Sequence, residues 1–148
     1  MQLDHKPATV LDSALLASWN SQLIRDEGHP NKMSVPELEV RMRGWLNSGS
    51  YRAVIFQRDA TPVGYALFGL EPDSTIYLRQ FFIAREHRRQ GIGTAAMNLL
   101  MHQIVPRDAR ITIVVLAGNE AGQKFWSSLG FAKHALIMER PAGRGGKS

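Results

Sequence analysis

A short stretch rich in arginine and glycine, Arg88-Arg89-Gln90-Gly91-Ile92-Gly93, holds the residues of this chain best suited to bind a ligand. Glycines let the backbone bend sharply and expose successive N–H groups. Such groups at the start of a helix attract negative charge. Arg88 and Arg89 add formal positive charge at the same bend. The combination predicts a site for a pyrophosphate.

Two common phosphate-binding patterns fit this stretch poorly. A P-loop needs a lysine followed by serine or threonine after its second glycine, and the stretch has neither. Gly91–Ala96 fits the dinucleotide pattern G-x-G-x-x-A, but the acidic residue expected about 20 positions later is missing from Ile113–Leu116. A closely packed helix start with solvated arginines is the alternative that these residues leave open.

The elements that must position this stretch follow from hydrophobic spacing and turn residues. Two helices are expected first, each opened by a capping box, Thr9–Asp12 for one and Ser34–Glu37 for the other. Short turns then predict an antiparallel meander, and the strand–helix–strand that follows predicts a parallel pair. The expected strands are 51–56, 63–70, 76–83, 111–116 and 131–138, and the later helices are 91–105 and 119–130. A short strand before the first helix is also allowed.

The fold class predicted by this order is α/β, a mixed and mostly antiparallel sheet with helices on both faces. The 148 residues suit one domain, expected over 1–140, and the glycine-rich tail 141–148 is expected to be disordered. We expect no membrane span and no secretory signal. The chain has no cysteine, which excludes disulfides, a thiolate nucleophile and sulfur-based zinc sites. We expect no metal and a cytoplasmic location.

The basic charge of the chain, formally +5 at pH 7, indicates an anionic partner or only a solvated surface. A phosphorylated cofactor and nucleic acid are the two kinds of anionic partner to weigh. The arginines are scattered along the chain, and no DNA- or RNA-reading motif is present. We therefore expect no nucleic-acid partner and no membrane partner.

Two motifs of this chain resemble those of the GNAT acetyltransferases. The stretch Arg88–Gly93 is similar to the family signature R/Q-x-x-G-x-G/A, which binds the pyrophosphate of coenzyme A there. Asn119-Glu120-Ala121-Gly122-Gln123-Lys124-Phe125-Trp126 and the following Gly130-Phe131 resemble the second family motif, N-x-x-A-x-x-F-Y and then G-F. Ile83 stands at the family's usual valine, whereas Arg85 replaces a frequent proline. The motifs and their linking elements cover residues 76–138.

The resemblance implies the GNAT fold, in which acetyl-CoA lies where strands 76–83 and 111–116 splay apart. It also implies direct acetyl transfer to a primary amine of a small molecule or peptide, and it allows a homodimer. Main-chain groups of Phe81, Phe82 and Ile83 are expected to pair with pantetheine, and Asn119 to contact it unless it only caps its helix. The expected cofactor-binding residues are Phe81, Phe82, Ile83, Arg88, Arg89, Gln90, Gly91, Ile92, Gly93, Thr94, Asn119, Phe125 and Trp126.

One departure concerns Trp126, which stands where the family often has a tyrosine that protonates the departing thiolate. An indole N–H can donate a hydrogen bond but cannot act as an acid. Ser127 or water would then substitute, or the thiolate leaves unaided, and Trp126 as core is an alternative. Glu27 and His29, in the loop that lines the family's acceptor site, are the candidate bases. The alternative for each is a charged loop residue that only contacts solvent.

Arg79 is an unusual charge in an apolar strand, where Tyr77, Arg79, Phe81 and Ile83 are expected to share one face. Arg79 and Tyr77 are therefore candidate substrate-binding residues. Arg79 could bind a carboxylate of the acceptor or pair with a buried acid. Trp126 and the absence of an obvious base also leave open a second function, a non-catalytic sensor that binds acyl-CoA without turnover.

Overall fold

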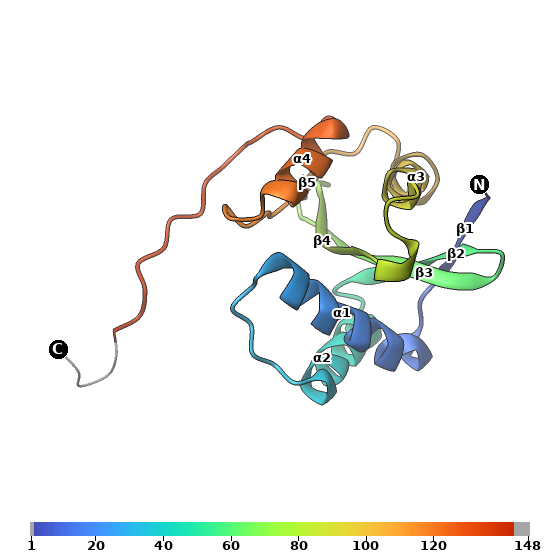
Figure 1. Cartoon of the computed structure of the whole chain (residues 1–148), viewed down its shortest axis with the longest axis horizontal. Coiled ribbons are helices and arrows are strands. Elements are labelled where there is room, and N and C mark those ends of the chain that lie inside the picture. Colours follow the sequence, from blue (N-terminus) through green and yellow to red (C-terminus); the bar gives the residue numbers. More distant parts are fainter. Residues whose placement is uncertain (1, 144–148) are drawn as a thin grey trace.

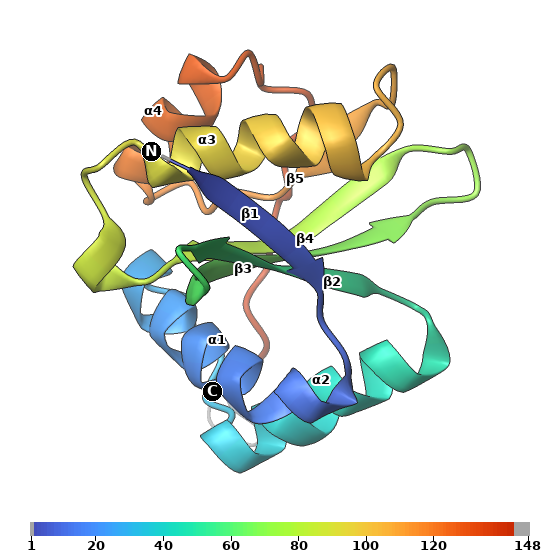
Figure 2. The ribbon, with the colours of Figure 1, turned by 90° about the vertical axis from the view of Figure 1, so that its right-hand side faces the viewer.

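A five-stranded sheet forms the centre of the molecule, with helices on both of its faces (Figures 1 and 2). The computed structural model describes residues 2–143. The strand order is β1-β2-β3-β4-β5, antiparallel throughout except for the parallel pair β4 and β5. The strands are β1 (Leu3–Pro7), β2 (Arg52–Arg58), β3 (Thr61–Leu70), β4 (Ile76–Ile83) and β5 (Ile111–Ile113). This confirms the α/β class, the parallel pair and the short first strand.

The helices divide between the two faces of the sheet (Figure 2). α1 (Ser13–Glu27) and α2 (Val35–Ser48) cover one face. α3 (Ile92–Leu99), extended by a π-helical turn (Leu100–Ile104), and α4 (Glu120–Ser128) cover the other. Both predicted capping boxes form, the first at a 3-10 turn (Val10–Asp12) that leads into α1. Within residues 2–143, no helix is long and apolar enough to cross a membrane.

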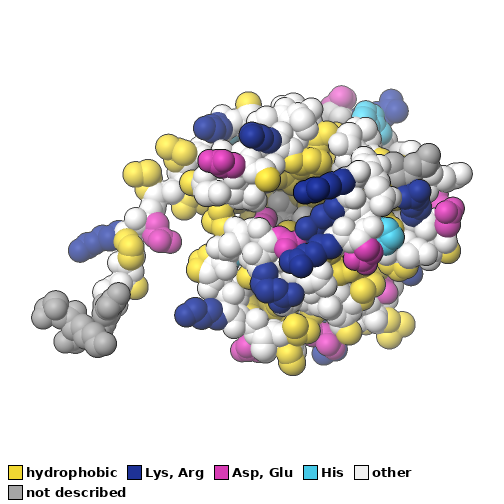
Figure 3. Space-filling view, in the orientation of Figure 1, with side chains coloured by type: hydrophobic (Ala, Val, Ile, Leu, Met, Phe, Trp, Pro, Cys, Tyr) yellow, Lys and Arg dark blue, Asp and Glu magenta, His cyan; other side chains and the backbone are white. Residues whose placement is uncertain are grey.

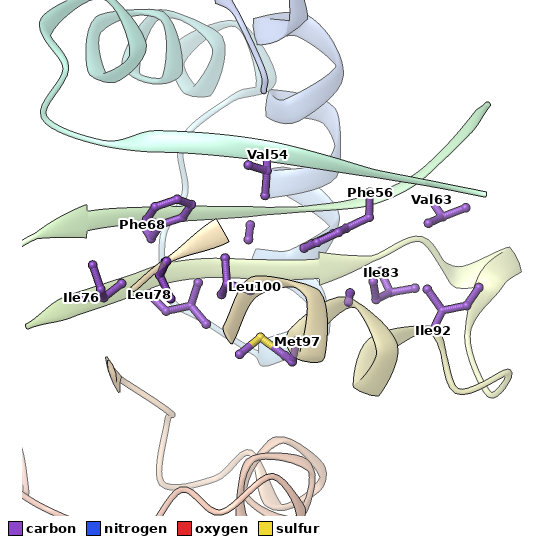
Figure 4. Packing of buried hydrophobic residues seen from close by; sticks show 13 residues of the cluster. Val54, Phe56, Val63, Phe68, Ile76, Leu78, Ile83, Ile92, Met97 and Leu100 are labelled. Atoms are coloured by element: carbon purple, nitrogen blue, oxygen red, sulfur yellow. The ribbon is translucent and has the colours of Figure 1, made fainter. Parts of the chain in front are cut away.

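A hydrophobic core lies on each face of the sheet, and together they fix the position of β4. Beneath α3, Phe56 of β2 and Ile83 of β4 pack against Met97 and Leu100 (Figure 4). Beneath α1 and α2, the fully buried Tyr65 of β3 packs with other aromatic and aliphatic side chains. The second core comprises Leu16, Trp19, Met42, Ala53, Ile55, Tyr65, Leu67, Phe82 and Ala84.

A β-bulge in β4 overturns one prediction about the faces of this strand. The register between β3 and β4 shifts at Leu67 and Phe68, which leaves Arg79 as an extra residue in β4. A bulge reverses the alternation of side chains beyond it. Phe81 and Ile83 therefore pack beneath α3, whereas Arg79 stacks against α2 on the opposite face. The prediction that Tyr77, Arg79, Phe81 and Ile83 share one face is wrong.

The chain after α4 differs most from the sequence-based expectation. The predicted strand 131–138 is wrong, because residues 131–143 form no regular secondary structure. Phe131 and His134 still contact Trp126 and Arg110, and the chain then leads away from the body of the protein (Figure 1). Apolar residues predict a strand only where a partner strand pairs with it, and within residues 2–143 this segment has none. The predicted strand 111–116 is also shorter, and ends at Ile113. Of the tail expected to be disordered over 141–148, residues 144–148 lie outside the described residues.

Candidate active site

The bend between β4 and α3 has a backbone that exposes the start of the helix. Gly91 immediately precedes α3 with φ +76°, a left-handed conformation that glycine adopts without strain. Arg89 also has a positive φ, of 61°. Because Gly91 has no side chain to cap the helix, the first N–H groups of α3 lack a capping partner at this position. The bend predicted at residues 88–93 is therefore present.

Arg88 holds this bend by hydrogen bonds to the end of β4 and to the last turn of α1. Its Nε donates to the carbonyl oxygen of Ile83 at 2.7 Å, and its Nη2 donates to Asp26 Oδ2 at 2.6 Å. Arg85 Nη2 donates to the other oxygen of Asp26 at 2.8 Å. Burial would raise the pKa of Asp26, but the hydrogen bonds and charges of Arg85 and Arg88 outweigh it and hold the pKa below 3.8. The end of α1 is thereby joined to the bend.

Basic side chains gather around the same bend. Arg58, at the end of β2, donates through Nη1 to Gln90 Oε1 at 2.6 Å, which brings a further guanidinium group to this loop. Figure 3 shows Lys and Arg side chains along one side of a hollow between α1 and α4, with hydrophobic side chains at its floor. This arrangement suits an extended ligand with a strongly anionic end.

The two parallel strands separate after a short pairing. β4 pairs with β5 only between Ile76–Leu78 and Ile111–Ile113. Beyond Leu78, the side of β4 that faces β5 has no strand partner in the part of the chain that the structure describes. We call this side of residues 79–83 the open edge of β4. The splay implied by the sequence resemblance is thus present.

Two residues direct their main-chain groups to the open edge. Ala84 N donates to the carbonyl oxygen of Val63 in the antiparallel ladder with β3. Backbone groups of successive strand residues point to alternate sides, so those of Phe82 also face β3, and those of Phe81 and Ile83 face the open edge. The carbonyl of Ile83 already accepts from Arg88. The groups left at this edge are the N–H and carbonyl of Phe81 and the N–H of Ile83.

An aromatic cluster joins α4 to Phe81 of β4. Phe125 of α4 stacks on Phe81 with ring centres 5.9 Å apart. Trp126 meets Phe81 edge-on at 5.5 Å and Phe131 at 5.3 Å, so its indole packs as part of this cluster. A Cβ atom at Gly93 would lie 3.3 Å from the ring of Phe125, so glycine there allows α3 and α4 to approach each other. Gly93 therefore has a packing role as well as a place in the bend.

The two other polar candidates on α4 face different surroundings. Asn119 caps the helix, because its Oδ1 accepts from the N–H of Gly122 at 3.0 Å. Ser127 is exposed and shares an outer face of α4 with Glu120 and Lys124, where these residues line a shallow depression. The side chain of Ser127 thus lies on a different face of the helix from the aromatic cluster.

The acetyltransferase (GNAT) family model matches residues 17–131 of this chain. The chain belongs to the GNAT acetyltransferase family. No curated protein matches it.

Solved structures resemble this GNAT protein in fold. A possible acetyltransferase from Clostridium difficile 630 has a TM-score of 0.77 at 14% identity, covering 97% of this chain and 99% of that one. A predicted acetyltransferase with acetyl-CoA from Clostridium acetobutylicum has a TM-score of 0.72 at 17% identity, and the match covers 95% of this chain and 96% of that one. The ribosomal-protein-alanine N-acetyltransferase from Brucella melitensis has a TM-score of 0.70 at 16% identity, and the match covers 96% of this chain and 100% of that one. At these identities the likeness shows the shared fold alone.

On the α1–α2 side, the two candidate bases of this GNAT protein lie in different environments. Glu27 ends α1, where burial, and then the charge of Asp26, raises the pKa of its carboxyl above 4.5. His29 lies in the exposed loop, and its Nδ1 accepts from the N–H of Asn31 at 3.0 Å. A half-buried carboxyl with a raised pKa is the better suited of the two to accept a proton.

Of the two candidate substrate residues, Arg79 contacts aromatic side chains of α2 and of the segment just before β2. Arg79 Nη1 donates to the hydroxyl of Tyr51 at 3.2 Å, and within residues 2–143 it forms no ion pair with an acid. Tyr77 is half-buried, and burial raises the pKa of its hydroxyl. The acid-pairing alternative for Arg79 is therefore not seen among these residues.

Sequence reasoning missed several polar residues of this region. In the sequence, Asp26 lies at the start of the loop expected between the first two helices, and nothing near it indicates a partner. Its partners Arg85 and Arg88 lie 59 and 62 residues further along the chain. Tyr65 donates to Gln80 Oε1 at 2.7 Å in a buried pair that joins β3 to β4. A buried polar residue amid an apolar strand, such as Gln80, is the signal that could have indicated this pair.

Proposed function

We propose that this GNAT acetyltransferase uses acetyl-CoA to acetylate a primary amine of a small molecule or a peptide. The observation that carries the proposal is the open edge of β4, which leads into the basic bend at the N-terminus of α3. An extended ligand with amide groups and a diphosphate matches both features, since the edge offers main-chain hydrogen bonds and the bend attracts negative charge. The relative from Clostridium acetobutylicum with acetyl-CoA provides a precedent for the donor.

In this proposal the donor is held mainly by backbone groups. Phe81 and Ile83 would pair with pantetheine, with Phe82 directed to β3 behind them. The diphosphate would bind at the bend, where the guanidinium of Arg88 holds the loop in shape while the N–H groups contact the ligand. The Nδ2 of Asn119 would reach pantetheine, and Phe125 and Trp126 would border it. The bend residues in this role are Arg88, Arg89, Gln90, Gly91, Ile92, Gly93 and Thr94.

Proton transfer from the acceptor is assigned to Glu27 in this mechanism. Its carboxylate takes a proton from the ammonium group, and the free amine nitrogen attacks the carbonyl carbon of the thioester. A main-chain N–H of Phe81 or Ile83 donates to the carbonyl oxygen as negative charge develops on it. The new C–N bond forms as the C–S bond breaks, the sulfur leaves as a thiolate, and the nitrogen releases its second proton to solvent to give the neutral amide. We propose direct transfer to the amine, and the absence of cysteine excludes a thiol-linked acyl-enzyme.

Departure of the thiolate needs no dedicated acid in this proposal. The indole N–H of Trp126 cannot protonate it. Ser127 would have to act from an exposed face of α4. An ordinary thiol has a pKa of about 8.5, so the thiolate is a good enough leaving group near neutral pH. The reaction should therefore slow little when Ser127 is replaced by alanine.

Binding and turnover test this function separately. Acetyl-CoA should raise the melting temperature of the protein, because a ligand of the folded state stabilises it. A screen of amines should then release coenzyme A thiol, detected with a thiol reagent. No binding at about 1 mM acetyl-CoA would reject the proposal, since that corresponds to a free energy weaker than about 4 kcal/mol. Tight binding without turnover on any amine would favour the non-catalytic sensor instead.

We also propose a homodimer, supported by the segment after α4. Leu136, Ile137 and Met138 are 82%, 78% and 86% exposed, a run of apolar side chains that water disfavours. The outer edge of β5 is without a strand partner in residues 2–143, and an extended segment of a second copy could pair with it. The cytoplasmic location stays a prediction from the sequence.

A further inference from the structure

Two arginines from different elements stack on one indole on the α2 side of β4. The guanidinium carbon of Arg41 lies 4.5 Å from the ring centre of Trp45, and that of Arg79 lies 4.7 Å from the same centre. Arg79 also lies 5.5 Å from the ring centre of Tyr51 and donates to its hydroxyl. We call Arg41, Trp45, Tyr51 and Arg79 the arginine–indole cluster.

The positive charge of this cluster is not neutralised by the residues that the structure describes. Neither arginine takes part in an ion pair there. Arg41 Nη2 donates to the neutral Asn20 Oδ1 at 3.3 Å, and its buried Nε has no hydrogen-bond partner. Burial, and then the charge of Arg79, lowers the pKa of Arg41. Two like charges held together with an unpaired buried donor are costly unless an anion joins them.

The β-bulge in β4 is what brings Arg79 to this cluster. Without the extra residue, the alternation that buries Phe81 and Ile83 beneath α3 would direct Arg79 to the same side. The bulge instead directs the guanidinium to α2, where it stacks on Trp45. Bulges near active sites often redirect a side chain in this way. The local irregularity is thus accounted for by the position it gives to one charge.

The cluster and the proposed base share one neighbourhood. Arg41 bonds to Asn20 of α1, and Glu27 follows Asn20 by two turns of the same helix, about 10 Å along its axis. The charge of Glu27 acts on the hydroxyl of Tyr65, and Tyr65 acts in turn on Arg41. A small acceptor could therefore present an amine at Glu27 and a second group at the cluster.

We infer that the arginine–indole cluster binds a carboxylate of the acceptor, so that the substrates are primary amines with a carboxylate several bonds from the nitrogen. The inference rests on the proposed acetyl transfer and adds the class of its acceptor. Stacking on an indole leaves the edge N–H groups of a guanidinium directed outward, in the fork that a planar carboxylate accepts. Arg41 and Arg79 act as specificity-determining residues, and Trp45 as the surface that orients them.

Matched pairs of amines test the inference. We would measure kcat/KM for 4-aminobutyrate and 6-aminohexanoate, each against its carboxamide, and for aminoethyl phosphate as a second anion. A carboxylate should be preferred over its carboxamide by at least about tenfold, the size expected for charge-assisted hydrogen bonds. Arg41→Met and Arg79→Met should each remove most of this preference, by raising KM for the carboxylate far more than KM for the carboxamide. A preference for the phosphate alone would replace carboxylate by phosphate and overturn the inference.

The control is Arg43→Met, which removes a neighbouring arginine of α2 that pairs with Glu39 at 2.6 Å on the exposed face. It should leave the preference intact. Equal kcat/KM for carboxylates and carboxamides, or equal losses for both in Arg41→Met, would overturn the inference while acetyl transfer itself stands. If no amine turns over, we would compare the melting temperature with 6-aminohexanoate and with its carboxamide, each in the presence of coenzyme A. Only the carboxylate should raise the melting temperature, and only in protein that keeps both Arg41 and Arg79.

Discussion

Arg88 donates through Nη2 to Asp26 Oδ2 at 2.6 Å and so joins the last turn of α1 to the bend before α3, across 62 residues of chain. The same guanidinium holds the carbonyl of Ile83 at the end of β4. One side chain therefore connects the proposed acceptor side of the molecule, where Glu27 follows Asp26, to the proposed diphosphate site. Its contribution to donor binding would come from shaping the bend more than from direct contact.

The first prediction concerns this connection. Asp26→Asn should weaken binding of acetyl-CoA about fivefold and lower the free energy of unfolding at pH 7 by about 1 kcal/mol, because the bend loses its anchor. Isothermal titration and thermal melts measure the two effects. Asp108→Asn, in an exposed turn, is the matched control and should change neither.

The effect of Asp26 on stability should also depend on pH in one direction. Its pKa is lower in the folded protein than the ordinary 3.8, so the stabilisation is complete above that value and disappears as the pH falls through the lowered pKa. The difference in melting temperature between the wild type and Asp26→Asn should therefore narrow below pH 3.8. A difference that persisted at lower pH would contradict the ionic role of Asp26.

The second prediction concerns the proposed base. Glu27→Gln should lower kcat/KM at least about 100-fold, within the range for loss of a general base. The activity of the wild type should fall as the pH drops through an apparent pKa above the ordinary 4.5, because only the carboxylate accepts a proton. Glu27→Gln should lack this step. Since the raised pKa makes the ionised form unfavourable in the fold, the variant should be at least as stable at pH 7 as the wild type.

His29→Gln is the counterpart that discriminates between the two candidate bases. It should retain more than about a third of the wild-type kcat/KM, because His29 is exposed and its Nδ1 is taken by the N–H of Asn31. The reverse pattern, with His29→Gln inactive and Glu27→Gln active, would assign the base to His29.

The third prediction concerns the close pairing of β3 with β4. A Cβ atom at Gly64 would overlap the carbonyl oxygen of Phe82, a backbone atom that cannot move aside without disturbing the strand beside the open edge. Gly64→Ala should therefore lower the free energy of unfolding by about 2 kcal/mol or more. Gly44→Ala, in α2 with no atom within 4 Å of the added Cβ, should instead stabilise the protein by about 0.5–1 kcal/mol. Urea denaturation of both variants measures the contrast.

The parts of the site that could be predicted from the sequence are those encoded locally. The capping box at Ser34 and Glu37 forms with both of its hydrogen bonds, at 3.3 and 2.8 Å. The bend at Gly91 needs only a glycine before a helix, and both are visible in the sequence. The splay of β4 from β5 followed from the family resemblance, and the residues themselves indicated only the parallel pair.

The parts that could not be predicted depend on contacts between distant residues. Nothing near Arg79 in the sequence signals a bulge, because the bulge exists only in the register with β3. Asp26 acquires its partners only when the bend folds onto α1. The strand expected over 131–138 has the apolar residues of a strand but no neighbour to pair with in residues 2–143. Strand propensity does not include the partner that a strand requires.

The last prediction concerns that partner. If the exposed run Leu136–Met138 is covered by a second copy, the wild type should be dimeric by light scattering, and the triple replacement of these residues by aspartate should give a monomer with the same coenzyme A affinity. Val40→Asp is the control, because Val40 is a single apolar residue that is 66% exposed on α2, and isolated residues of this kind are common on monomers. It should leave the mass unchanged. A monomeric wild type would contradict the proposal that a second copy covers this segment.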